Sequence, residues 1–268
     1  MYTKILTESI KKELEALKQA GKFKVERELE SAQGAEVTLG NNKTLMFASN
    51  NYLGLANHPE ILKATKEGLD KYGFGLSSVR FISGTEKIHK TLEKKLAKFL
   101  GVEDAILYST NFMSNLGFFA TITNETFGSS ESYIDAIYSD ELNHASIIDS
   151  FKLSNREKVI KRIYPHGDLA TLEKFLAEDQ QKNYRFKIIV TDGVFSMEGY
   201  LANLPKIKTL AEKYDALLFV DDAHAVGVMG KSSIIMPGLS AGMQTFFGMI
   251  RLTSCYLVLP LEPWRVFN

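Results

Sequence analysis

The sequence is short of the residues that mark several classes of protein. Its 268 residues include a single cysteine, Cys255, which excludes an intrachain disulfide and a zinc site built from several thiolates. Neither sign of charge is in excess, because 32 Lys and Arg balance 32 Asp and Glu, so a basic surface for nucleic acid or an anionic membrane is not expected. Hydrophobic residues make up 45% of the chain, enough to bury a substantial core. We expect a globular protein of a reducing compartment.

The N-terminal segment lacks the features of a targeting sequence. Residues 1–20 carry acidic side chains as well as lysines and have no long apolar run. The expected location is therefore cytoplasmic, with the mitochondrial matrix left open although no presequence is evident. Apolar residues recur at helical spacing, at Leu6, Ile10, Leu14 and Leu17. This pattern predicts an amphipathic helix in an arm, residues 1–45, that packs on the body or on a partner subunit.

The C-terminal segment, residues 232–268, lacks lysine and nearly all charge. It holds three charged side chains in 37 residues, together with the only tryptophan. Its first 19 residues are uncharged, but they include Pro237 and three glycines, so a membrane-spanning helix is not favoured. The strand and helix pattern of the preceding residues stops here. We expect a divergent, poorly ordered tail that is foreign to the domain before it.

Between these ends, residues 46–231 alternate between strands and helices. Apolar runs rich in β-forming residues predict the strands Ala105–Tyr108, Ile134–Tyr138, Val159–Tyr164, Phe186–Val190 and Ala216–Val220. Helical spacing occurs between them, in Glu86–Leu100 (ended by Gly101), Leu169–Phe175 and Ile207–Tyr214. The alternation predicts an α/β domain with a mostly parallel sheet. Ligands of such sheets bind beyond the carboxyl ends of the strands.

Two segments that follow predicted strands open helices. Thr110, Asn111 and Phe112 come after the first strand. The N–H groups of a helix N-terminus can bind a phosphate, or the hydroxyl can simply cap the helix. His144 follows the second strand. Its imidazole could stack on a flat heterocycle or shuttle protons, or it could serve as a helix cap.

Two further segments follow later strands. Ser196 lies in a glycine-punctuated loop after Val190, where hydroxyl and carboxylate groups crowd together or bond to their own backbone. Asp221 and His224 follow the most apolar strand of the chain. A carboxylate at the mouth of a buried strand is costly unless it is paired with a cation, a metal or a cofactor nitrogen. Asp221 is therefore the sharpest local indication of a functional site.

Together the chain's motifs resemble the α-oxoamine synthases, enzymes of the PLP-dependent transferase fold type I that use pyridoxal 5'-phosphate (PLP). Those that match in order and spacing are Asn50–Leu55, Gly73–Thr85, Leu142–Ser146, Asp192–Met197 and Val220–His224. Residues 191–204 look most like the glycine C-acetyltransferases of threonine catabolism. The resemblance, which runs from about Glu26 to Lys231, implies an α/β large domain with a mostly parallel sheet.

The resemblance also implies the roles of individual residues. Thr110, Asn111 and Phe112 would hold the phosphate of PLP. His144 would stack on the pyridine ring as a catalytic residue. Asp221 would pair with the pyridinium nitrogen, so that the ring can accept electrons from the α-carbon of glycine. No metal is implied.

The remaining implied roles include a departure from the family. Ser196 and the catalytic His224 would bond the ring oxygen of PLP, and Asn50 would help to bind the substrate carboxylate. The family's Schiff-base lysine comes well after the position of His224, but residues 251–256 read Arg-Leu-Thr-Ser-Cys-Tyr. The only lysine after His224 is Lys231, which comes too early to match.

These observations lead us to divide the chain into three parts. We expect a helical arm at residues 1–45, an incomplete PLP-binding large domain at 46–231 and a divergent tail at 232–268, with the small C-terminal domain of the family missing. The implied reaction joins glycine and acetyl-CoA to give 2-amino-3-ketobutyrate and CoA. We expect this chain to be inactive because the Schiff-base lysine is absent.

Alternative functions stay open on the sequence. One is a non-catalytic subunit that docks on an intact homologue. Another is an α-oxoamine synthase that makes 8-amino-7-oxononanoate, 5-aminolevulinate or 3-ketosphinganine. The expected partners are glycine, acetyl-CoA or another acyl-CoA, and a second copy in a homodimer, with no nucleic acid or membrane.

Overall fold

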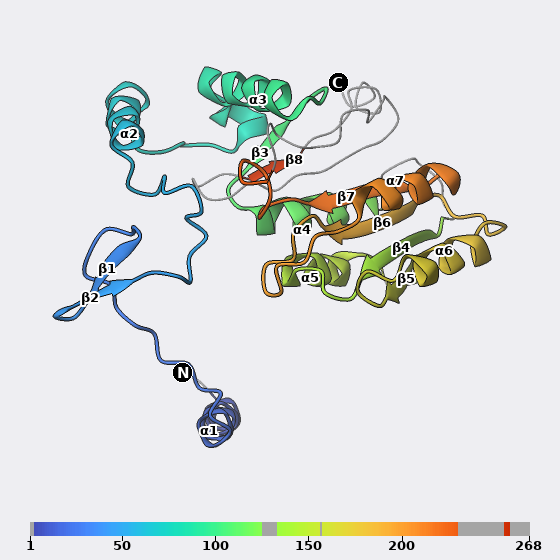
Figure 1. Cartoon of the computed structure of the whole chain (residues 1–268), viewed down its shortest axis with the longest axis horizontal. Coiled ribbons are helices and arrows are strands. Elements are labelled where there is room, and N and C mark those ends of the chain that lie inside the picture. The colour runs from blue at the N-terminus through green and yellow to red at the C-terminus, as the bar shows by residue number, and fades with distance from the viewer. Residues whose placement is uncertain (1–2, 125–132, 156, 230–254, 258–268) are drawn as a thin grey trace.

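The computed structural model describes residues 3–124, 133–155, 157–229 and 255–257 (Figure 1). Its central sheet has four parallel strands in the order β5-β4-β6-β7. Their bounds are Asp135–Asp140 for β4, Val159–Tyr164 for β5, Lys187–Asp192 for β6 and Leu217–Asp221 for β7. All four were predicted from their apolar runs, and the parallel α/β fold is confirmed. The structure extends β4 and β6 by two residues, as far as the acidic side chain that ends each.

Helices cover both faces of this sheet. Helices α4 (Asn111–Ile122) and α5 (Ala145–Leu153) pack on one face, and α6 (Leu169–Glu178) and α7 (Leu204–Lys213) on the other (Figure 1). Successive residues of a strand point to opposite faces. Ile188 therefore packs with α4 and α5, whereas Ile189 packs with α6 and α7. Because both faces of the sheet are covered, β4, β6 and β7 are buried along nearly their whole length, whereas the edge strand β5 is buried only at its two ends.

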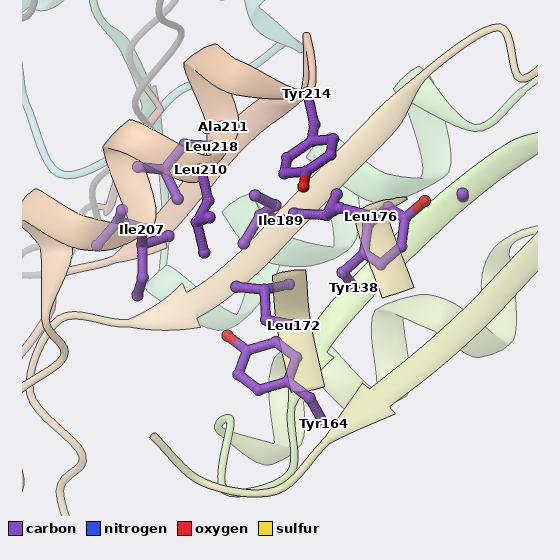
Figure 2. Packing of buried hydrophobic residues seen from close by; sticks show 12 residues of the cluster. Tyr138, Tyr164, Leu172, Leu176, Ile189, Ile207, Leu210, Ala211, Tyr214 and Leu218 are labelled. Atoms are coloured by element: carbon purple, nitrogen blue, oxygen red, sulfur yellow. The ribbon is translucent and has the colours of Figure 1, made fainter. Parts of the chain in front are cut away.

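Figure 2 shows the cluster beneath α6 and α7. Leu172 and Leu176 of α6 are fully buried against Ile189 of β6. Burying one such leucine stabilises the fold by about 2 kcal/mol. Tyr138 of β4 is also fully buried, and its hydroxyl donates to the carboxylate of Asp179 at 2.9 Å. The polar end of this tyrosine is thus paired inside an otherwise apolar cluster.

Helix α3 (Lys87–Leu100) ends where the sequence predicted and begins one residue later, because Glu86 is its N-cap. Its N-terminus is closed by a capping box between Glu86 and His89. His89, for which no role was predicted, thus serves as a cap. Gly101 ends the helix in the left-handed conformation at φ 69°, which favours glycine. Leu96 and Leu100 pack on Val226, which follows the sheet's last strand, and so join α3 to the body.

Strand β3 (Ile106–Tyr108) pairs with a segment that we did not expect to be a strand. Residues Cys255–Leu257 form β8, antiparallel to β3, with Ile106 opposite Leu257. Our expectation that no strand pattern survives after residue 231 is therefore wrong at this point. The pairing satisfies backbone N–H and C=O groups of β3, which lies outside the central sheet. The other residues of 230–268 lie outside the described residues, so the disorder expected of the tail stays a prediction.

The N-terminal part extends away from the body (Figure 1). Helix α1 (Lys4–Gln19) forms as predicted, with Thr3 as its cap. A hairpin of β1 (Glu36–Leu39) and β2 (Asn42–Leu45) follows. None of α1 is buried, so the expected packing on the body is wrong: the linker carries its apolar face beyond the reach of this chain's core. Packing on a partner subunit stays a prediction.

Between the hairpin and α3, the chain forms helix α2 (Pro59–Tyr72) and a π-helical turn, Arg80–Gly84. His58 caps α2 through its side chain, which accepts a hydrogen bond from the Glu60 amide. This second histidine without a predicted role is therefore also a cap. Among the helices that the structure describes, none combines the length and apolar character needed to cross a bilayer.

Candidate functional site

Acidic residues gather at the carboxyl ends of the central strands. Asp140, Asp192 and Asp221 are the last residues of β4, β6 and β7, and Asp192 is the register partner of Asp221. Asp222 follows directly. All four are buried, with at most 5% of each residue exposed. The parallel order of the strands thus brings together carboxyl groups that are far apart in the sequence, at the edge where such sheets bind ligands.

Asp221 is held by three N–H donors. Its Oδ2 accepts hydrogen bonds from the side-chain amides of Asn111 at 2.7 Å and Asn115 at 2.8 Å. Its Oδ1 accepts a third bond from the backbone N–H of Ala223 at 3.1 Å. Three N–H donors stabilise a buried negative charge. The sequence predicted that Asp221 needs a partner, and the structure supplies amide donors.

The two neighbouring carboxyl groups respond to that charge. Burial, followed by the negative charge of Asp221, raises the pKa of Asp192 to about 8. The same two causes raise the pKa of Asp222 to about 7. Glycine is required between the strands here, because a Cβ on Gly193 would come within 2.0 Å of Oδ1 of Asp222. At neutral pH Asp192 is therefore mostly protonated, and Asp222 is about half protonated.

His144 lies at the N-terminus of α5, near this carboxylate group. Its backbone N–H donates to Oδ2 of Asp192 at 3.2 Å, and its ring Nδ1 lies 2.7 Å from the hydroxyl of Ser146. Ser146 also donates its backbone N–H to the same Nδ1, so His144 is the cap of α5. The ring is otherwise exposed. Capping and a role toward a ligand are thus compatible in this residue.

His224 approaches the site from the segment after β7. Its Nδ1 lies 2.8 Å from the phenol oxygen of Tyr52, which belongs to the first of the sequence motifs. Burial lowers the pKa of His224, the charge of Asp221 opposes this effect, and His144 lowers the pKa further. A neutral imidazole at physiological pH follows from the net direction. The contact also joins the segment around Asn50 to the sheet.

The N-terminus of α4 provides a place for an anion. Thr110 caps the helix, and its hydroxyl accepts the N–H of Met113 at 3.0 Å. Phe112 is 41% exposed beside it. The neighbouring Asn111 extends its amide to Asp221, so the helix N-terminus and the carboxylate are joined directly. Positive partial charge at the helix end and negative charge on Asp221 thus lie at two sides of one site.

Two predicted residues are not drawn into this network. Ser196 lies in the exposed turn after β6, and Asn50 is also exposed. Within the described part of the chain, neither forms a hydrogen bond with Asp221, His144 or His224. Their predicted roles toward a cofactor and a substrate stay predictions.

Sequence reasoning missed several residues of the network. Asn115, Ser146 and Tyr52 were not given roles, although Tyr52 and Ser146 lie inside quoted motifs. Asn115 could have been found, because it lies four residues after Asn111 and so on the same face of α4. Ser146 carries no such signal, since a serine in the first turn of a helix is ordinary.

Comparisons with known proteins agree with this geometry. The family model described as aminotransferase class I and II matches residues 42–250, which include the start of the segment that we assigned to the tail. The 2-amino-3-ketobutyrate coenzyme A ligase of Salmonella typhimurium is 50% identical over 82% of this chain and 53% of its own length. The 8-amino-7-oxononanoate synthase of Bacillus pumilus is 46% identical over the same shares. The chain thus spans about half the length of these curated relatives.

Solved structures show the same fold. Serine palmitoyltransferase from S. paucimobilis, with PLP and myriocin bound, superimposes with a TM-score of 0.83 at 24% identity, over 99% of this chain and 68% of its own. The family model covers well over half of the sequence, and the relatives carry the reaction names that the motifs indicated. The chain therefore belongs to the aminotransferase class I and II family of PLP-dependent enzymes, and it resembles the family's α-oxoamine synthases.

Proposed function

We propose that the described residues form the cofactor-binding part of a PLP-dependent acyltransferase of the glycine C-acetyltransferase type. Its reaction would join glycine to the acyl group of acetyl-CoA. One observation carries the proposal: the buried carboxylate of Asp221 is held by three N–H donors at the end of β7, beside the N-terminus of α4. The relatives named 2-amino-3-ketobutyrate coenzyme A ligase, of whose length this chain spans about half, support the choice of reaction.

The donor set of the site fits PLP. The group is an anion at its phosphate and a cation at its protonated ring nitrogen. The N-terminus of α4, with Thr110, suits the first, and Asp221 suits the second. His144, which is joined to Asp221 through Ser146 and Asn115, presents an exposed ring. The charges of the site are thus complementary to the two charged ends of PLP.

PLP, when bound, supplies an electron sink for the charge that develops at the α-carbon of glycine. The chain's own residues set the conditions for this chemistry. Asp221 would accept the ring N–H and hold that proton, and its neighbour Asp192, whose pKa is raised to about 8, is mostly protonated at neutral pH and adds little competing negative charge. His144 would cover a face of the ring and exclude water from it. Tyr52 orients the imidazole of His224.

The sequence offers no lysine at the position where the family has its covalent anchor. We therefore expect PLP to bind this chain without a covalent link and without a positioned base for the α-proton of glycine. A group that serves as both base and anchor contributes several orders of magnitude to the rate. CoA release from acetyl-CoA and glycine by this chain alone is expected to stay below detection.

The test is a titration of the purified chain with PLP, followed by absorbance and by borohydride reduction with mass analysis. We expect reversible binding that Asp221→Asn weakens about tenfold or more, because a hydrogen bond to a charged group is worth about 1.5–3 kcal/mol. Asp149→Asn, which removes an exposed carboxylate from α5, is the matched control and should bind like the wild type. Equal affinity in all three chains, or a pyridoxyl adduct on Lys231, would contradict the proposal.

A second candidate has support from the relatives named 8-amino-7-oxononanoate synthase. That reaction would use the same cofactor but a different acyl group. Binding of acetyl-CoA and of longer acyl-CoA molecules to the PLP-loaded chain discriminates between the two. Preference for acetyl-CoA supports the first proposal, and preference for a longer chain supports the second.

A further inference from the structure

Two buried polar residues connect the parts of the site. Asn115 lies in α4 and Ser146 in α5, helices that pack together on one face of the sheet. Asn115 is 2% exposed and Ser146 is fully buried. Polar side chains this deep are costly unless every group finds a partner. Their partners are Asp221 on one side and His144 on the other.

The side-chain NH₂ group of Asn115 forms one hydrogen bond toward each of these two sides. Its Nδ2 lies 2.8 Å from Oδ2 of Asp221 and 2.8 Å from the hydroxyl oxygen of Ser146. A carboxylate only accepts hydrogen bonds, so the atom that faces Asp221 must be the nitrogen of the amide. The amide has two hydrogens, and each contact takes one. Asn115 thus bridges the carboxylate and the hydroxyl.

The hydrogen bonds at Ser146 fix the tautomer of His144. The backbone N–H of Ser146 points to Nδ1 of His144 at 3.2 Å, and an N–H can only donate. Nδ1 is therefore the unprotonated ring nitrogen, and the proton resides on Nε2. The Ser146 hydroxyl accepts from Asn115 and has its own hydrogen available for Nδ1, 2.7 Å away. Two donors then hold one ring nitrogen.

We propose that Asn115 and Ser146 are positioning residues that join Asp221 to His144, and that they hold the His144 ring as its Nε2–H tautomer. The exposed ring cannot be fixed by packing, so hydrogen bonds to a buried pair must fix it. Asp221 and His144 come from β7 and α5, and the bridge sets their relative position. The tautomer needs only the chain itself, whereas its use toward PLP rests on the proposed function.

The first experiment reads the tautomer directly. The chain is labelled with ¹⁵N-histidine, and long-range ¹H–¹⁵N correlations are recorded above pH 8 without PLP. His144→Gln assigns the signal among the five histidines. We expect one protonated nitrogen at Nε2 and an unprotonated Nδ1. Ser146→Ala should lower the ratio of the two tautomers about fivefold, which corresponds to one hydrogen bond of about 1 kcal/mol.

A matched control lies in the same helix. Ser150 is as buried as Ser146, but its hydroxyl donates to the backbone oxygen of Ser146 and not to the histidine. Ser150→Ala should therefore keep the wild-type ratio. A protonated Nδ1 in the wild-type chain overturns the proposal whatever the variants do. An equal shift in Ser146→Ala and Ser150→Ala also overturns it, because the effect would then be general to α5.

A second measurement separates this inference from the proposed function. PLP is titrated into the wild type, Ser146→Ala and Asn115→Leu, with circular dichroism as the check that each is folded. We expect about threefold weaker binding for Ser146→Ala and a larger loss for Asn115→Leu, which also removes a donor from Asp221. Failure of the wild type to bind PLP would refute the proposed function but leave the tautomer result standing. Unchanged affinity in both variants would overturn the positioning role alone.

Discussion

Replacing Asp192 by asparagine should make the chain more stable at neutral pH. In the folded state the pKa of Asp192 is raised from 3.8 to about 8, first by burial and then by the charge of Asp221. A carboxyl group with a raised pKa contributes stability below its unfolded pKa, and this stability is lost as the pH rises through the folded value. At about 1.4 kcal/mol per pH unit, the loss between pH 4 and pH 8 has an upper limit of about 6 kcal/mol.

Asparagine keeps the contacts of the side chain. Its amide oxygen can accept the backbone N–H of His144, as Oδ2 of Asp192 does. The other oxygen of Asp192 is buried without a hydrogen-bond partner among the described residues, so the asparagine NH₂ leaves no worse mismatch. The variant therefore removes the titration and little else.

The assay is urea denaturation, followed by circular dichroism, between pH 5 and pH 8.5. We compare the free energies of unfolding of Asp192→Asn and the wild type at each pH, because other titrating groups cancel in the difference. The advantage of the variant should grow steadily with pH and level off above about pH 8. A difference that does not change with pH would refute the reasoning, since it would mean that Asp192 is already ionised in the folded chain.

Two other Asp→Asn variants serve as controls for this pH dependence. Asp222→Asn should show the same sign but level off about one pH unit earlier, because the folded pKa of Asp222 is raised only to about 7. Asp168→Asn should show the opposite sign. Hydrogen bonds from Thr171 lower the pKa of this half-buried helix cap, so its carboxylate contributes stability above its unfolded pKa that is lost toward acid.

The remaining predictions concern stability and are measured by the same urea assay at pH 7. Arg185→Ala should destabilise the chain by about 3–5 kcal/mol, because it leaves the fully buried carboxylate of Asp135 without its bidentate partner; an unchanged midpoint would contradict this. Gly193→Ala should cost about 1–3 kcal/mol, since its Cβ would collide with Asp222. Gly68→Ala, in an open position of α2, should instead stabilise by up to about 1 kcal/mol, and a loss there would show that space is not what distinguishes the two glycines.

The sequence predicted the central elements well because local signals there agree with the tertiary environment. Val159–Tyr164 has the same bounds in both descriptions, because its β-branched and aromatic residues favour a strand even at the edge of the sheet, where only its two ends are buried. Gly101 ended its helix as predicted because few other residues tolerate the left-handed conformation. Because ligands of parallel sheets bind beyond the carboxyl ends of the strands, the sequence alone predicted Asp221 and His144 at one edge of the sheet.

Prediction failed where a segment's partner is distant in the sequence. The strand Cys255–Leu257 has no pattern of its own and exists by pairing with Ile106–Tyr108. The apolar stripe of Lys4–Gln19 predicted a helix correctly, but a stripe does not say which surface it meets. The local pattern of apolar residues shows which face of an element can be buried, whereas the surface that the face packs against depends on the rest of the chain.

The site divides in the same way. Residue types and their order predicted that Asp221, His144 and the start of α4 belong to one site, because each directly follows a predicted strand. Only the tertiary structure decided how they are joined: Asn115 reaches Asp221 across 106 positions of sequence, and Tyr52 reaches His224 across 172. Likewise, the raised pKa values of Asp192 and Asp222 arise from burial beside a third carboxylate. Hydrogen bonds and desolvation act over a few ångströms in space, and a linear sequence does not record that distance.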